Sequence, residues 1–129
     1  MSLVGEQQSS ARFHLRGSDA ARQHSSARDL ALLARELLKH PLTTALTSQR
    51  GARISTLDGK RSYSFSSRNT LVSTPGVLGL KTGYTARAGR CQAIYAKRGG
   101  HKVLLVILHG SHWGDAADLL ALALDRAQP

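Results

Sequence analysis

The stretch Val77-Leu78-Gly79-Leu80-Lys81-Thr82-Gly83-Tyr84-Thr85 decides how this chain folds. Pro75-Gly76 marks a turn in front of it, and the stretch itself is predicted to be one strand interrupted by Gly79 and Gly83. Glycines in strands often mark the close approach of another backbone or of a ligand. The strand is therefore a candidate binding element as well as a structural one.

Two more strands are predicted downstream. Cys91–Ala96 and Val103–His109 flank Lys97-Arg98-Gly99-Gly100, so they should pair as an antiparallel hairpin. The run Val103–Leu108 is apolar at every position, which is typical of a central strand covered on both faces. Cys91 is the only cysteine, so the chain forms no intramolecular disulfide, and its apolar setting predicts a small buried side chain.

A helix is predicted upstream, beginning at Ser26-Ala27-Arg28-Asp29, where a hydroxyl cap is followed three residues later by a carboxylate. Pro41 should stop it, because the residue before a proline is pushed out of the α region. Its predicted apolar face consists of Ala27, Leu30, Ala31, Leu33, Ala34, Leu37 and Leu38.

The remaining elements are a hairpin and a closing helix. Asp58-Gly59 is a hairpin turn signal between two predicted strands, Ala52–Leu57 and Lys60–Phe65, in a region that is otherwise mostly Ser, Thr and Arg. After Ser111, apolar residues recur at helical spacing, with two aspartates in the first turn. These apolar residues are Trp113, Ala116, Ala117, Leu120, Leu124 and Ala127.

The predicted order is helix, short hairpin, three antiparallel strands and helix, an α+β arrangement with helices packed on an antiparallel sheet. With 129 residues, of which 41% are hydrophobic, the chain is long enough for one core and too short for two. Residues 1–23 show no period of 3.6 or 2, so we expect an irregular lead-in there.

Charge is unevenly distributed along the chain. The formal net charge is +10, and no Asp or Glu occurs between Gly59 and Gly114, a segment with nine Lys and Arg residues. Such a block attracts anions, whether a carboxylate substrate, an anionic wall polymer or nucleic acid, or it forms a solvated basic surface.

The context of Lys81-Thr82-Gly83 resembles a known family. Arg68-Asn69-Thr70-Leu71-Val72 precedes the strand, Ala88-Gly89 follows it, and the upstream helix contains His24-Ser25-Ser26-Ala27-Arg28-Asp29-Leu30-Ala31-Leu32-Leu33-Ala34. Together they resemble the serine-type D-alanyl-D-alanine carboxypeptidases, penicillin-binding relatives of the serine β-lactamases, whose motifs are Ser-x-x-Lys, Ser-x-Asn and Lys-Thr-Gly. The resemblance implies a partial penicilloyl-serine-transferase fold, with 24–127 as the C-terminal half of the catalytic domain and 1–23 outside the match.

The resemblance also implies the roles of three substrate-binding residues. The Lys81 cation would stabilise developing negative charge, the Thr82 hydroxyl would donate to the terminal carboxylate of the substrate, and Gly83 would let a peptide lie close to the strand. Pleating sends Lys81 and Thr82 to opposite faces, so both serve one cleft only at a twisted sheet edge. The implied ligands are peptidoglycan peptides and β-lactams.

The nucleophile motif is absent, because none of the five lysines has a serine three residues before it. Ser67-Arg68-Asn69 spells Ser-x-Asn but lies too close to Lys81, so we interpret it as a coincidence. Gly110-Ser111-His112-Trp113 occupies the region where the family often has a carboxylate-binding arginine, so the sequence departs from the family pattern at that contact. Without a nucleophile no acyl-enzyme forms, so we expect this chain alone to be inactive.

We expect a truncated, frame-shifted or wrongly started reading frame, whose upstream half would have supplied the signal peptide, the nucleophile and the second motif. The helix from Ser26 and the run Val103–Leu108 should then need partners from that half. The resemblance implies a periplasmic or cell-envelope location, whereas Met1–Ala21 has no secretory apolar core, so the chain expressed as given would stay in the cytoplasm. No stretch is long enough to span a bilayer.

Other functions remain as alternatives. One alternative is a small non-enzymatic basic module that binds nucleic acid or another polyanion, and another is an inactive remnant. Nucleic acid is the weaker alternative, because stacking aromatic residues are few and no nucleic-acid-binding signature is present. His109 and His112 lack a third ligand nearby in sequence, so no metal site is predicted, and the resemblance implies no cofactor.

Overall fold

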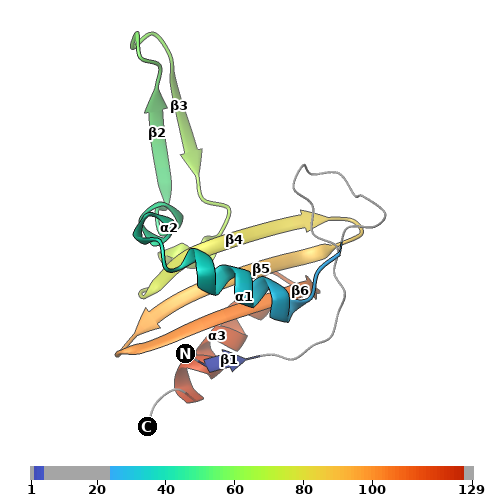
Figure 1. Ribbon diagram of the computed structural model, residues 1–129. Helices are drawn as coiled ribbons and strands as arrows, with labels where there is room; N and C mark the ends of the chain where they lie inside the picture. The colour runs from blue at the N-terminus through green and yellow to red at the C-terminus, as the bar shows by residue number, and fades with distance from the viewer. Residues whose placement is uncertain (1, 5–23, 127–129) are drawn as a thin grey trace.

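A four-stranded sheet with strand order β1-β6-β5-β4 forms the centre of the molecule (Figure 1). The computed structural model describes residues 2–4 and 24–126. Strands β4 (Val77–Thr85), β5 (Gly89–Arg98) and β6 (His101–Gly110) are antiparallel neighbours, which confirms the three predicted strands and their order. The β5–β6 turn is shorter than predicted, because Gly99 and Gly100, with φ of 55° and 82°, close the hairpin in two residues.

The predicted irregular lead-in is wrong at its start. Strand β1 (Ser2–Val4) pairs in parallel with β6, placing Ser2 opposite Val103 and Val4 opposite Leu105. Three residues are too few to show a period of 2, and the partner is about a hundred positions away in the sequence, so no local pattern reveals this strand. The rest of the predicted lead-in, 5–23, lies outside the described residues.

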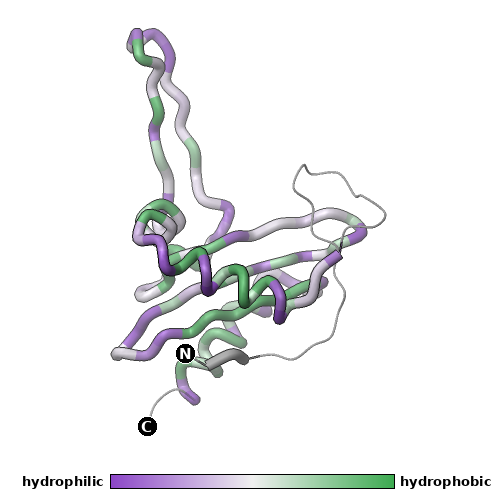
Figure 2. Tube along the Cα trace, in the orientation of Figure 1, coloured by the Kyte–Doolittle hydropathy of each residue, from purple (hydrophilic) through white to green (hydrophobic). Residues whose placement is uncertain are grey.

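Two helices cover opposite faces of the sheet, α1 (Ala27–Leu37) in front and α3 (Asp115–Arg126) behind in Figure 1. Strand β6 alternates between them: Leu104 packs with Ala31 and Ala34 of α1, whereas Val103 and Leu105 pack with α3. Figure 2 shows a long hydrophobic stretch along this strand. The expectation of a central strand covered on both faces is confirmed.

The expectation that Val103–Leu108 needs a partner from a missing half is wrong, because α1 and α3 of this chain supply its cover. On the outer side of α1, by contrast, apolar side chains are exposed. Leu32, Leu33 and Leu37 are 50%, 59% and 48% exposed, and Leu42 and Leu46 of the following helix are 65% and 58% exposed. This apolar surface remains open in the chain as described.

Local signals determine the ends of α1. The Ser26 hydroxyl accepts a hydrogen bond from the Asp29 amide at 3.1 Å, as the capping pattern predicts. The helix ends at Leu37, and Pro41 does not simply stop it but begins a second helix, α2 (Pro41–Thr47). The sequence patterns above do not predict α2, although proline is favoured at the first helical position, where its missing N–H is not needed.

Within residues 24–126, no helix is long and apolar enough to cross a membrane.

The predicted hairpin is present as β2 (Gly51–Ser55) and β3 (Ser62–Ser66), which project away from the main sheet in Figure 1. Its turn is wider than predicted, because the Thr56 amide donates to the Arg61 carbonyl at 2.9 Å. The Thr56 hydroxyl and the Lys60 amide donate to Asp58 and hold the pKa of that carboxyl below its usual value. A short 3₁₀ helix, η1 (Thr70–Ser73), then leads into β4.

We predict that Leu104→Ala lowers the free energy of unfolding by about 3 kcal/mol, because it leaves a cavity between β6 and α1. Leu104 is 1% exposed, whereas Leu33 is 59% exposed and is the matched control. Leu33→Ala should change stability by less than about 1 kcal/mol. Urea unfolding of both variants measures the difference, and equal losses would contradict the core described above.

Candidate functional site

The Lys81-Thr82-Gly83 segment lies on β4, an edge strand of the described four-stranded sheet. Lys81 pairs with Ala93, Thr82 with Gln92 and Gly83 with Cys91, and no described strand pairs with the other side of β4. Opposite residues of an antiparallel pair share a face. Lys81 and Gly83 therefore lie on the α1 face and Thr82 on the α3 face, as the pleat predicts, and they meet only along the strand's outer edge.

The three residues leave their functional groups open to a ligand. The Lys81 side chain is exposed and its ammonium donates to the Thr82 carbonyl. No hydrogen bond from another described residue reaches the Thr82 hydroxyl. A Cβ added at Gly83 would have no heavy atom within 4 Å, so the space beside this residue is empty of described atoms. The edge thus offers a cation, a hydroxyl and a backbone that another chain can approach.

Helix α2 positions this strand through one tight contact. The Thr47 hydroxyl donates to the Leu78 carbonyl at 2.7 Å. Gly79 lies so close that an added Cβ would be 2.3 Å from the Thr47 hydroxyl oxygen and 2.5 Å from the Thr47 Cβ. Its φ of 129° is also one that other residues rarely adopt. The first glycine of the predicted strand therefore serves backbone approach, as the sequence indicated.

An arginine and two aromatic residues form a cluster beyond the end of the motif. The Arg90 guanidinium carbon lies 5.6 Å from the centre of the Tyr84 ring and 5.9 Å from that of Trp113. Arg90 also donates to the Ser111 carbonyl at 2.8 Å. The sequence does not predict this cluster, because Arg90 stands out there only as one charge of the basic block and Trp113 as a helix residue.

Buried Gln92 connects β5 to the segment that contains Trp113 through a hydrogen bond. Its side-chain amide donates to the Trp113 carbonyl at 3.2 Å, and the residue is only 4% exposed. This hydrogen bond holds the connection between β6 and α3 against the face that carries Thr82. A buried amide without a partner would be costly, so the contact is structurally specific.

The Ser-x-Asn triplet has a structural role. The Ser67 hydroxyl accepts from the Asn69 amide at 3.2 Å, and the Asn69 side-chain oxygen accepts from the Leu71 amide at 3.1 Å. Asn69 is thus the cap of η1 and is 6% exposed. These contacts agree with our interpretation of the triplet as a coincidence.

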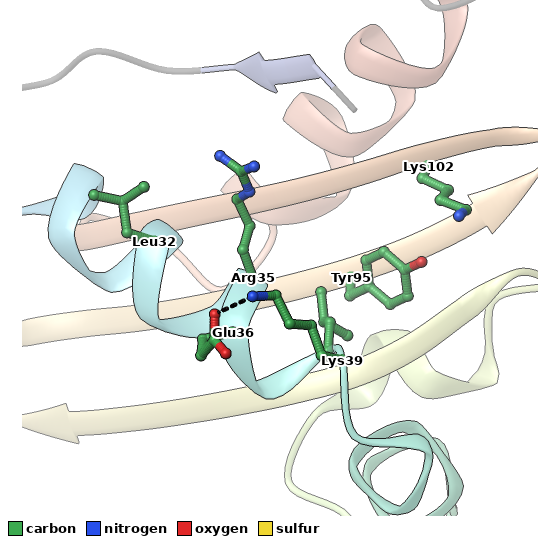
Figure 3. Close-up of a pocket in the computed structure, with 7 residues that line it drawn as sticks. Leu32, Arg35, Glu36, Lys39, Tyr95 and Lys102 are labelled. Atoms are coloured by element: carbon green, nitrogen blue, oxygen red, sulfur yellow. Dashed lines mark ion pairs between the residues drawn. The ribbon is translucent and has the colours of Figure 1, made fainter.

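The cleft shown in Figure 3 lies apart from this segment, between the end of α1 and strands β5 and β6. Its volume is about 540 Å³, and its lining is Leu32, Arg35, Glu36, Leu38, Lys39, Tyr95 and Lys102. Lys39 forms an ion pair with Glu36 at 2.6 Å, and the hydrogen bond and charge of this lysine hold the pKa of Glu36 below its usual value. Neither β4 nor the Arg90 cluster contributes to this cleft.

The remaining candidates have local structural explanations. A ring nitrogen of His109 lies 3.2 Å from the Ala88 carbonyl oxygen. Among the residues that the structure describes, no group of three or more His, Cys, Asp or Glu side chains is placed to hold a metal ion. Cys91 is 6% exposed, with its sulfur 3.5 Å from the Ala88 carbonyl oxygen, which confirms the predicted burial.

The fold is that of the penicillin-binding DD-peptidases. The crystal structure of the Streptomyces K15 DD-transpeptidase matches with a TM-score of 0.75 at 23% identity, over 82% of this chain and 44% of that one. Penicillin-binding protein D2 from Listeria monocytogenes, in its cefotaxime-bound form, matches with a TM-score of 0.67 at 29% identity, over 84% of this chain and 44% of that one. The predicted antiparallel sheet with flanking helices is confirmed.

The family model for D-alanyl-D-alanine carboxypeptidases, peptidase family S11, matches residues 10–112. This chain belongs to that family. The D-alanyl-D-alanine carboxypeptidase DacF of Bacillus subtilis is 33% identical over 88 residues, covering 68% of this chain and 23% of the relative. DacB2 of Mycobacterium tuberculosis, a carboxypeptidase of the same name, is 28% identical over 102 residues, covering 74% of this chain and 35% of the relative.

These comparisons support the predicted family, and none favours the small polyanion-binding module. The chain spans about a quarter to a third of the two curated relatives. The match to the family model also begins at residue 10, upstream of the boundary at residue 24 that we expected.

We predict that Gly79→Ala displaces β4 from α2 and lowers the free energy of unfolding by at least about 1 kcal/mol, because the new methyl group overlaps Thr47 and φ is unfavourable. Gly83→Ala, with open space around it, is the matched control and should unfold like the parent. Thermal unfolding and the amide NMR shifts of β4 provide the measurements. Equal behaviour of the two variants would show that the contact between α2 and Gly79 is not needed.

Proposed function

We propose that this chain is the C-terminal half of the catalytic domain of a serine-type D-alanyl-D-alanine carboxypeptidase, with residues 24–127 as that half. The observation that carries the proposal is the family match over 10–112 together with Lys81-Thr82-Gly83 on a sheet edge that has no described partner strand. The whole enzyme removes the terminal D-alanine from a peptide through an acyl-serine, and that serine comes from outside this sequence.

The role of β4 follows from what its edge offers. A substrate peptide lies along the strand, where unpaired backbone groups of β4 hydrogen-bond to it as a further strand would. Lys81 places a positive charge where the reacting carbonyl oxygen becomes negative, which lowers the energy of the transition state. Thr82 donates its hydroxyl to the terminal carboxylate, and Gly83 lets the peptide backbone approach.

The ligands follow from the same proposal. The peptide is a peptidoglycan stem peptide ending in D-alanyl-D-alanine, and β-lactams compete for its place. The cefotaxime-bound form of the Listeria relative supports β-lactam binding. Since peptidoglycan lies outside the cytoplasmic membrane, the complete enzyme works in the cell envelope. The positive charge of segment 59–114 favours the approach of a peptide that ends in a carboxylate.

We predict that the purified chain is not acylated by a fluorescent penicillin, because it contains no Ser-x-x-Lys segment. Gel fluorescence after incubation provides the measurement, with a complete family member as the positive control. A stable one-to-one label that unlabelled penicillin displaces would contradict the absence of a nucleophile.

We predict that joining this chain to the N-terminal half of a family member, with its serine intact, restores acylation. Lys81→Ala should then slow acylation about a hundredfold or more, because one stabilising charge beside the reacting centre is lost. Lys102→Ala is the matched control. Lys102 lines the separate cleft, so its loss should change the rate only a few-fold, and added salt should remove that effect.

The measurement is the acylation rate of both variants at low and high salt. Equal losses that disappear at high salt would mean that the two lysines only add to a general field. Lys81 would then have no place in the site.

A further inference from the structure

The cleft between the end of α1 and strands β5 and β6 has a volume that suits a small ligand (Figure 3). Its volume of about 540 Å³ lies within the range of about 300–1,000 Å³ that is typical of small-molecule sites. Leu32 and Leu38 contribute apolar side chains to the lining, and three cations and one carboxylate contribute charge. The cleft therefore combines apolar contact area with an excess of positive charge.

Tyr95 presents a hydroxyl to this cleft. Its ring packs in the core with Ala31, Ala34 and Leu104, and the residue is 9% exposed. Figure 3 shows the hydroxyl at the outer end of the ring, on the side of Lys102. No described residue forms a hydrogen bond with this hydroxyl. Because the buried ring already fixes its position, the hydroxyl can donate to a ligand with little further ordering.

The positive charge of the cleft is only partly compensated. Glu36, the one carboxylate in the lining, is paired with Lys39 at 2.6 Å. Among the residues that the structure describes, no carboxylate forms an ion pair with Arg35 or Lys102. Two cations of the lining are thus left without a compensating charge.

A further lysine lies beside this lining. Lys97 pairs with Lys102 across β5 and β6, so the two side chains share one face of the sheet, the face of Tyr95. Like charges directly opposite each other destabilise a sheet. No acid of segment 59–114 offsets them, because that segment contains no Asp or Glu. An anion bound in the cleft would reduce this repulsion.

We propose that this cleft binds a phosphate monoester, whose phosphate group is held by Arg35, Lys102 and the Tyr95 hydroxyl. Such a group carries a charge of about −1.5 to −2 at neutral pH and three acceptor oxygens, so it matches two unpaired cations and one hydroxyl donor. A carboxylate has one charge and two oxygens, and it would leave one of the cations uncompensated. The inference does not depend on the proposed function, because none of the described residues of β4 lines the cleft.

The test is an NMR titration of the full chain at constant ionic strength. The two probes are glycerol 3-phosphate and glycerate, which carries a carboxylate and the same two hydroxyl groups. The parent chain should bind glycerol 3-phosphate about tenfold more tightly than glycerate, with saturating amide shifts at Arg35, Tyr95 and Lys102. Tyr95→Phe should weaken this binding about tenfold, because it removes only the hydroxyl donor. Arg35→Gln should weaken it at least as much.

Arg28→Gln is the matched control. Arg28 is exposed on α1, about two turns before Arg35, so its loss removes the same charge from the same helix outside the cleft. This variant should bind glycerol 3-phosphate like the parent. Tyr95→Phe keeps the buried ring and Arg35 is exposed, so both test variants should fold, and amide spectra without ligand check this.

Vesicles distinguish two sources of a phosphate monoester, a lipid headgroup and a soluble ester. Phosphatidylcholine vesicles with and without phosphatidic acid are sedimented with the parent chain and with Tyr95→Phe. Binding to phosphatidic acid that weakens in Tyr95→Phe assigns the cleft to a lipid headgroup. Equal vesicle binding by both proteins, together with binding of glycerol 3-phosphate that depends on Tyr95, assigns it to a soluble ester.

Three results would overturn the inference. They are the absence of saturating shifts at the cleft, equal affinities for the two probes, and equal binding of glycerol 3-phosphate by the parent and both test variants. The last result would mean that the net charge of +10 attracts the anion only through its general field. The penicillin acylation of the joined halves, which involves no phosphate ester, tests the proposed function separately.

Discussion

The structure depends on burying strand β6 on both of its faces. Val103, Leu104 and Leu105 are at most 1% exposed, with α1 on one side and α3 on the other. Because successive residues of a strand point to opposite faces, one continuous apolar run anchors both helices at once. The hydrogen bonds from β6 to β5 and from β5 to β4 then determine the place of every residue along the outer edge.

On that outer edge, β4 has no partner among the described strands. An unpaired strand edge invites association with another chain, and natural proteins usually cover or shorten it. Here β4 has nine residues, and its outer side carries Lys81-Thr82-Gly83. Its beginning is held by the tight contact of Gly79 with Thr47 and its end by the cross-strand pair of Tyr84 with Arg90. A strand held at both ends leaves its middle with little conformational freedom.

Charge acts at two ranges in this molecule. The net charge of +10 creates a broad field that draws anions toward the protein and weakens with salt. Lys81 has instead one specific position on the edge of β4, where its ammonium donates to the Thr82 carbonyl. The Lys39–Glu36 pair is exposed on both sides, at 69% and 63%, so it adds little to stability.

The sequence by itself determined the features that depend on neighbouring residues. These include the Ser26 cap, the presence of a hairpin around Asp58-Gly59, the span of β4 and the two-sided burial of Val103–Leu108, because capping, turn chemistry and periodicity act over a few positions. Only the tertiary structure decided that Ser2–Val4 pair with β6, and that Arg90 lies beside Thr82 between two aromatic rings. Strand register and packing join residues far apart in the chain, and no local pattern encodes which of them will meet.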